Sequence, residues 1–304
     1  MSKKILLKPY GGLCNRLGSI DSCISLAQKH GRELYVFWEE NSLLNCSFDR
    51  LFQPNEHFIL IPDSRKRIRH LINSAMFPSN IDQFTIFKKM MKRRVVNQYE
   101  ISKFIYNPQL QALYKIDGQD RNPDYSLDEY YNRFYKNINP LLEAAILEDS
   151  FYVASCFRLF EEKHLYRSFI PIGSIQDKID SLSDNFENVI GLHIRQTDLK
   201  VAIVNSTMEK FEERINGEIE KNENVKFFLA TDSQKVESAL IAKYPGRIIK
   251  QEISSYSRNV DSGIQDAVVD LFCLSRTKKI YGSVLSTFSY TASKIGGIEL
   301  VPVK

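Results

Sequence analysis

The amino-acid sequence predicts an α/β protein made of two domains. Three observations carry this prediction. Strand-like apolar runs alternate with segments of helical period near the amino terminus, the same alternation returns after residue 171, and 304 residues exceed what one hydrophobic core usually serves. The Pro- and Gly-containing segment 169–173 divides the two parts. We therefore expect an N-terminal domain over residues 1–170 and a C-terminal domain over residues 171–304.

The N-terminal part opens with a predicted βαβ unit. Its strand, helix and second strand are expected over residues 4–8, 17–30 and 34–38. The turn after the first strand holds Gly11 and Gly12, followed by Asn15 and Arg16. Its spacing is not G-x-G-x-x-G, so a dinucleotide site is not indicated. Turn geometry alone can explain the glycines, which leaves Asn15 and Arg16 as candidate functional residues at the tip.

The segment from about residue 50 to 166 has less regular patterning. Basic residues crowd into two runs, 65–69 and 88–94. Such runs usually form solvated helix faces, and the alternative is peripheral contact with an anionic membrane or an acidic acceptor. A net charge of only +4 argues against a nucleic-acid partner. A group of tyrosines either faces an acceptor or packs in the core: Tyr125, Tyr130, Tyr131 and Tyr135.

The segment 189–198 is the most informative of the C-terminal part. It reads as a buried strand that ends in polar, chargeable groups. Because strand residues alternate faces, His193 and Arg195 share one side. Ligands bind at the carboxyl ends of strands in open α/β sheets, and a guanidinium fork suits phosphate. We expect an anion site here, the alternative being a strand end that is merely solvated.

Two further strand ends point to the same edge of the sheet. The strand 225–231 stops at Asp232 before a helix over 234–244. The strand 279–283 precedes a helix whose first residues carry hydroxyls, namely Ser286, Thr287 and Ser289. Free N–H groups at that helix start would bind an anion. Ser233 or Thr287 could instead be simple helix caps.

Two capping-box patterns predict helix starts in the C-terminal part. They occur at residues 206–209 and 262–265. The second helix carries Ile264, Val268 and Leu271 at helical spacing, so we expect it to pack on the sheet.

Four segments together resemble the fucosyltransferase superfamily, which includes the bacterial nodulation fucosyltransferase, the α-1,6-fucosyltransferases and the protein O-fucosyltransferases. They are residues 11–17, 191–198, 228–232 and 266–292. The resemblance implies a GT-B-like α/β fold with two Rossmann-like domains facing a cleft. It further implies an acceptor on the N-terminal domain and a nucleotide sugar on the C-terminal one.

The resemblance also implies roles for particular residues. His193 and Arg195 match a His-x-Arg motif whose arginine holds the donor pyrophosphate. Asp232 matches an aspartate that contacts the nucleotide, and the hydroxyl cluster at the phosphates corresponds to Ser286, Thr287 and Ser289. Some members use the asparagine that corresponds to Asn15 at the acceptor side.

The sequence departs from the family pattern at two positions. Many relatives have two consecutive arginines where this chain has Arg195 and Gln196, so a phosphate-binding charge is missing or supplied elsewhere. The counterpart of a glutamate proposed as base is Ile203. The catalytic base is therefore left open. Asp198 is one candidate, although orienting Arg195 is its commoner role, and Glu39 and Glu40 are others.

No Asp-x-Asp occurs in the chain, so no such carboxylate pair holds a metal against a pyrophosphate. Together with the resemblance, this predicts metal-independent, inverting transfer of fucose from GDP-fucose to a glycan or glycolipid, without a cofactor. The alternatives are another nucleotide sugar as donor, or a non-catalytic protein that binds nucleotide sugars or glycans.

The remaining composition predicts a cytoplasmic location, with peripheral membrane association as the alternative. The sequence contains no apolar run of membrane-spanning length, and the apolar part of its first residues is too short for a signal peptide. Its five cysteines are scattered and odd in number, which indicates reduced thiols.

Overall fold

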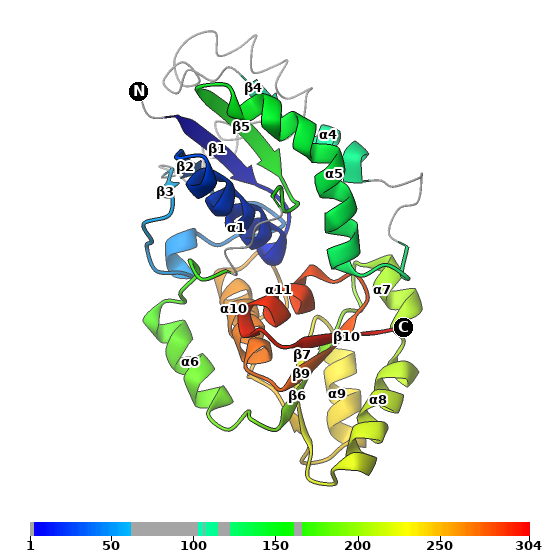
Figure 1. The fold of residues 1–304 in the computed structure, drawn as a ribbon. Helices are drawn as coiled ribbons and strands as arrows, with labels where there is room; N and C mark the ends of the chain where they lie inside the picture. Colours follow the sequence, from blue (N-terminus) through cyan, green and yellow to red (C-terminus); the bar gives the residue numbers. More distant parts are fainter. Residues whose placement is uncertain (1–2, 62–102, 106, 115–121, 161–165) are drawn as a thin grey trace. The chain divides into compact units, whose positions relative to one another are not determined.

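A computed structural model describes residues 3–61, 103–105, 107–114, 122–160 and 166–304 (Figure 1). The two basic runs at 65–69 and 88–94 lie outside these residues. The chain divides into two compact units. The first comprises Met1–Asp120 and Tyr130–Ile170, and the second comprises Arg121–Glu129 and Pro171–Lys304.

The first unit is built on a parallel sheet with the strand order β3-β2-β1-β5-β4. Its strands are β1 (Lys4–Pro9), β2 (Glu33–Val36), β3 (Ile59–Leu60), β4 (Lys103–Ile105) and β5 (Ser150–Ser155). Its helices are α1 (Leu13–Lys29), the 3₁₀ helix η1 (Phe48–Arg50), α4 (Asn107–Tyr114) and α5 (Leu127–Ile146), the last of which begins in the second unit. The strand β1 is central and buried, as its apolar sequence predicts.

The second unit contains another parallel sheet, ordered β10-β9-β6-β7-β8. Its strands are β6 (Val189–Ile194), β7 (Lys226–Thr231), β8 (Ile248–Ile249), β9 (Lys279–Ser283) and β10 (Glu299–Val303). Its helices are α6 (Gly173–Ser183), α7 (Lys200–Asn205), α8 (Met208–Lys221), α9 (Gln234–Lys243), α10 (Asp261–Ser275) and α11 (Thr287–Gly296). The strand β6 is central, with β7 and β8 on one side of it and β9 and β10, which come later in the chain, on the other. The topological switch point therefore lies between the carboxyl ends of β6 and β9.

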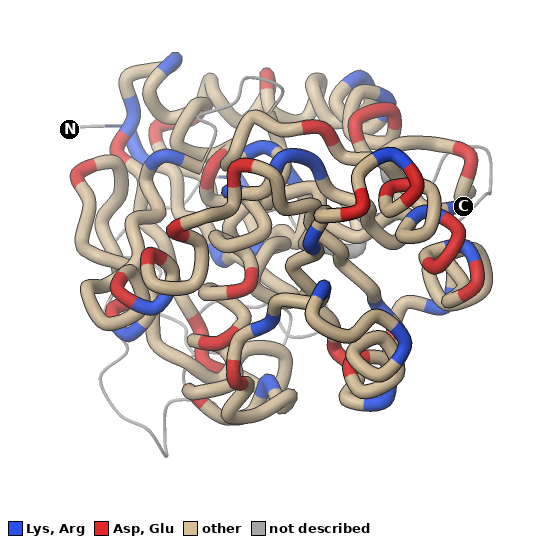
Figure 2. The backbone as a smooth tube through the Cα atoms, turned by 90° about the horizontal axis from the view of Figure 1, so that it is seen from below, with Lys and Arg blue, Asp and Glu red and all other residues tan. Residues whose placement is uncertain are grey.

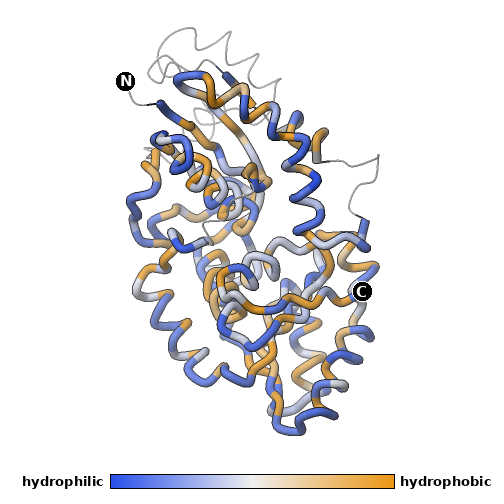
Figure 3. Tube along the Cα trace, viewed as in Figure 1, coloured by the Kyte–Doolittle hydropathy of each residue, from blue (hydrophilic) through white to orange (hydrophobic). Residues whose placement is uncertain are grey.

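The alternation of side chains in β6 divides the core of the second unit into two faces. One face packs against α8 and α9 through a buried apolar cluster that includes Ile190, Leu192, Phe211 and Leu240. The other face carries Gly191 and His193 and packs against α10 and α11. Figure 3 shows the corresponding hydrophobic colouring of the strands and the mixed colouring of α8. The side chain of His193 is thus directed to the α11 side of the sheet.

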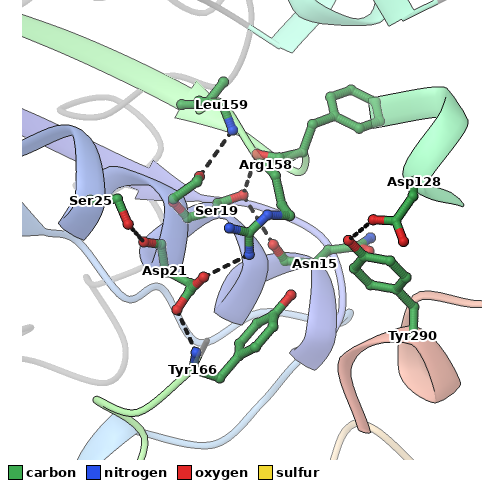
Figure 4. A network of polar contacts seen from close by, with 11 residues as sticks. Asn15, Ser19, Asp21, Ser25, Asp128, Arg158, Leu159, Tyr166 and Tyr290 are labelled. Atoms are coloured by element: carbon green, nitrogen blue, oxygen red, sulfur yellow. Dashed lines mark hydrogen bonds and ion pairs between the residues drawn. The ribbon is translucent and has the colours of Figure 1, made fainter. Parts of the chain in front are cut away.

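A buried polar network stabilises the first unit (Figure 4). The Asp21 carboxylate accepts hydrogen bonds from Arg158 Nη1 at 2.7 Å and from the Tyr166 backbone N–H at 2.7 Å. Both side chains of the ion pair are almost completely buried, with exposed fractions of 0% for Asp21 and 2% for Arg158. The network joins α1 to the segment that follows β5.

Several predicted boundaries and side-chain roles need correction. The helix α1 begins at Leu13 rather than Leu17, because Leu13 and Cys14 extend its buried face, and this places Asn15 and Arg16 in its first turn. Ser206 is not the cap of α8. Its hydroxyl donates to Val303 O at 2.6 Å and accepts from Val284 N–H at 2.9 Å, which ties β10 to the end of β9.

The core explanation holds for three of the four tyrosines. Tyr130, Tyr131 and Tyr135 are buried, whereas Tyr125 is half-buried.

All five cysteines are free thiols. Basic and acidic residues are interspersed along the backbone of both units (Figure 2). No helix in the described part of the chain is long and apolar enough to cross a membrane.

Candidate functional site

The carboxyl ends of β6 and β9 are joined at the switch point of the second unit. Arg195 directly follows β6, and its backbone N–H donates to the hydroxyl of Ser283, the last residue of β9, at 3.0 Å. This bond fixes the loop after β6 beside the loop that leads into α11. The three strand ends predicted to meet at one edge thus belong to neighbouring strands of one parallel sheet.

The guanidinium of Arg195 forms a two-pronged ion pair with Asp198. Arg195 Nε donates to Asp198 Oδ1 at 2.7 Å, and Nη2 donates to Oδ2 at 2.8 Å. Arg258 Nη2 lies 3.2 Å from the same Oδ2. Burial raises the pKa of Asp198, but the two arginines outweigh it and hold the pKa below its ordinary value. A carboxylate so stabilised is a weak base, so the geometry favours the orienting role of Asp198 over catalysis.

His193 is a neutral residue in this setting. Its ring stacks on Phe288 of α11 with centroids 4.9 Å apart, and its exposed fraction is 6%. Burial, and then the positive charge of Arg195, lower the pKa of His193 to about 3. Its Nδ1 has no hydrogen-bond partner within the described part of the chain. His193 can therefore offer a ligand a hydrogen bond but no positive charge.

The start of α11 supplies the second half of the site. Leu285, just before the helix, has a φ of 53°, a left-handed conformation that costs a non-glycine residue about 1–2 kcal/mol. Ser286 is the N-cap residue, yet its side chain forms no capping bond, and its buried Oγ has no partner among the described residues. Thr287 is half-buried in the first turn. Backbone N–H groups here are available to an anion.

Ser289 does not fit the predicted phosphate contact. Its side chain is fully buried, with an exposed fraction of 0%, and its hydroxyl donates to Ser286 O at 3.4 Å. Its Oγ lies against β9, where a Cβ added to Gly282 would come within 2.7 Å of it, and a sequence match cannot show this packing. Ser286 and Thr287 are left as the hydroxyl candidates.

Asp232 holds the arginine loop. Its Oδ1 accepts the Gln196 backbone N–H at 2.8 Å, and its Oδ2 accepts the Thr197 hydroxyl at 2.6 Å. The neighbouring Ser233 caps α9 by accepting Val236 N–H at 3.4 Å, as the capping alternative predicts. The nucleotide contact of Asp232 stays a prediction, but its support of residues 196–197 is direct.

In the first unit, Asn15 and Arg16 have different environments. The Asn15 side chain is half-buried beside the Gly11 turn, where φ is 87°. Arg16 is completely buried: its Nε donates to Gly11 O at 2.8 Å, its Nη2 donates to Asn41 Oδ1 at 3.0 Å, and its guanidinium lies 5.1 Å from the Trp38 ring centroid. Arg16 therefore clamps the turn to the loop after β2 and is not a ligand-facing residue.

Glu39 is also engaged within the first unit. Its Oε2 lies 3.2 Å from Lys8 Nζ and accepts from Asn41 Nδ2 at 3.2 Å, and its exposed fraction is 4%. Burial lowers the pKa of Lys8, and Glu39 partly offsets this effect. This buried pairing disfavours Glu39 as a base. Glu40 is half-buried and stays a candidate.

Sequence reasoning missed Ser283 and Arg258. Ser283 ends a strand, so its position was a usable signal. Arg258 lies in an irregular loop with no periodic pattern to place it. Within the described residues, no group of three or more His, Cys, Asp or Glu side chains is arranged to hold a metal ion.

No protein-family model and no curated protein sequence matches the chain. Solved structures do match. The fucosyltransferase NodZ from Bradyrhizobium has a TM-score of 0.57 at 20% identity, covering 96% of this chain and 93% of that one. POFUT1 in complex with GDP-fucose has a TM-score of 0.54 at 12% identity, with 99% and 98% covered. A mutant of Arabidopsis thaliana FUT1 in complex with GDP has a TM-score of 0.55 at 14% identity, with 99% and 70% covered.

These matches confirm the predicted fold class. The chain has an α/β fold of GT-B type with two parallel sheets, which it shares with the three structures named above. The resemblance inferred from four sequence segments therefore holds at the level of the fold.

Proposed function

We propose that the protein is a metal-independent, inverting glycosyltransferase that moves fucose from GDP-fucose to a glycan acceptor. The observation that carries the proposal is the switch-point site of the second unit. There an arginine fork directly follows β6, and two buried polar atoms, His193 Nδ1 near the end of β6 and Ser286 Oγ at the start of α11, have no hydrogen-bond partner among the described residues. Buried polar atoms are almost always hydrogen-bonded, so such atoms at a helix start are suited to a polar ligand. Structures of this fold have been solved with GDP and with GDP-fucose.

The proposed reaction breaks the bond between the sugar C1 and the phosphate oxygen. The electron pair stays with the departing GDP, and an acceptor hydroxyl attacks C1 from the opposite face and loses its proton to a base. Arg195 and the N–H groups at the start of α11 would stabilise the charge that grows on the diphosphate. His193, being neutral, would donate or accept one hydrogen bond.

We further propose the first unit as the acceptor side, with Asn15 as its contact residue. The glycine-rich turn lies at the carboxyl end of β1, and the Arg16 clamp fixes it there. A glycan or glycolipid acceptor presents hydroxyl groups that an asparagine amide can hydrogen-bond.

GDP should bind without added metal, in the millimolar range or tighter. The reason is that Arg195 offers charge where an Asp-x-Asp motif would hold a divalent ion, and the chain lacks that motif. Calorimetric titration with GDP, UDP, CMP and ADP, each with and without a chelator, measures this directly. Loss of GDP binding in chelator would overturn the metal-free mechanism, and a preference for another nucleotide would change the donor.

Asp232→Ala should weaken GDP binding by about 1–3 kcal/mol, because the Gln196 N–H, the Thr197 hydroxyl and any nucleotide donor lose their acceptor. UDP shares the diphosphate, so the loosened arginine loop should weaken UDP as well. Any additional loss specific to GDP measures a guanine contact.

Thr197→Val is the matched control for this prediction. It removes only the loop bond to Oδ2 and keeps the carboxylate. Calorimetry of both variants with both nucleotides separates the two roles. Unchanged affinity of Asp232→Ala for GDP and UDP would remove Asp232 from the site.

A further inference from the structure

Arg258 reaches the candidate site from a distant loop. It lies between β8 and α10, and its Nη2 is 3.2 Å from Asp198 Oδ2. The same carboxylate receives both prongs of Arg195. Two guanidinium groups thus flank one carboxylate beside the end of β6.

The loop that carries Arg258 is held in place by specific contacts. The Ser254 backbone N–H donates to Asp266 Oδ2 at 2.7 Å, and the Tyr256 hydroxyl donates to Glu237 Oε2 at 2.7 Å. The loop also presses on the first turn of α10, where a Cβ on Gly263 would lie 2.3 Å from Ser257 O. Only glycine permits so close an approach. These contacts with α9 and α10 fix the backbone of the loop from which the Arg258 side chain extends.

The charges of the side chains near Asp198 distinguish Arg258 from Arg195. Arg195 and Asp198 alone form a neutral pair, and the next residue, Gln196, is uncharged. His193 adds no charge, because burial keeps it neutral. Arg258 therefore gives the Asp198 carboxylate a second cationic partner, while Asp232 holds the neighbouring loop through residues 196–197. The side chain of Arg258 is 39% exposed and open to a ligand.

We propose that Arg258 is a second diphosphate-binding arginine, which contacts the donor together with Arg195 while Asp198 holds the two guanidinium groups side by side. The inference rests on the proposed function, because it assumes a nucleoside diphosphate at this site. Arg258 would then supply a second positive charge to the diphosphate, which the uncharged Gln196 cannot supply.

The test compares GDP with guanosine, which lacks both phosphates. Arg258→Ala should weaken GDP binding about tenfold, the size expected for one charged hydrogen bond, and leave guanosine binding unchanged. Arg258→Lys should recover only part of the loss, because it keeps the charge and loses the fork. The matched control is Arg276→Ala, since Arg276 is equally exposed, at 39%, and pairs with Asp180 in the same unit. A GDP affinity of Arg258→Ala equal to wild type, or a loss matched by Arg276→Ala, overturns the proposal.

A second comparison separates phosphate contact from the mere positioning of Asp198. In an Asp198→Asn background no carboxylate charge is left for Arg258 to neutralise. If Arg258 contacts the diphosphate, adding Arg258→Ala should still weaken GDP binding about tenfold. If the added change has no effect there, Arg258 acts only through Asp198 and the proposal is wrong. Failure of the wild-type protein to bind any nucleoside diphosphate would instead overturn the proposed function itself.

Discussion

Arg195→Ala is expected to lower the rate of sugar transfer by about a hundredfold or more, since losing one preorganised donor at a developing charge costs about 3 kcal/mol. The fold should survive, because Arg195 follows the end of β6 and its side chain is 20% exposed. Arg195→Lys should restore little, since an ammonium group cannot reproduce the two-pronged geometry. Steady-state transfer rates, with thermal unfolding as a check on folding, measure both effects. Near-native activity in either variant would refute the phosphate-binding role.

Asp21→Ala should lower the free energy of unfolding by about 3–5 kcal/mol, because it leaves a buried cation without its counter-ion. Arg158 would keep its 2% exposure but lose the carboxylate 2.7 Å away, and the Tyr166 N–H would lose its acceptor. Urea unfolding of wild type and variant measures the difference.

Two comparisons sharpen the stability prediction. Asp180→Ala breaks a solvent-exposed ion pair with Arg276 and should change stability far less. The double variant Asp21→Leu with Arg158→Met removes both charges together and should be less destabilised than Asp21→Ala. Equal stability of Asp21→Ala and wild type would contradict the buried pairing.

The elements that carry the site could be predicted from the sequence because their patterns are local. The run ending at Ile194 is buried and largely apolar, as parallel strands are, and it is the strand β6. The strand before Asp232 and the helix opened by Thr287 were equally visible. The order of strands in the sheet then brings these ends to one edge.

The side-chain environments could not be predicted, because they depend on tertiary contacts. Arg16 was predicted as a candidate functional residue at the tip of the turn, yet three hydrogen-bonding partners and Trp38 hold its side chain in the core. Ser289 was predicted at the phosphates from its motif, yet its side chain packs against Gly282 of β9. Arg258 is separated from Arg195 by α7, α8, β7, α9 and β8, and contacts of its loop with α9 and α10 hold it in place.

The release of GDP from GDP-fucose in the absence of acceptor tests the central claim most directly. The proposed function predicts slow release by the wild-type protein, since an enzyme that stabilises the departing diphosphate also permits water to attack the donor. Arg195→Ala should reduce this release about a hundredfold, to the spontaneous rate or near it. GDP binding without any release of GDP from GDP-fucose would instead identify a nucleotide-sugar-binding protein that performs no transfer.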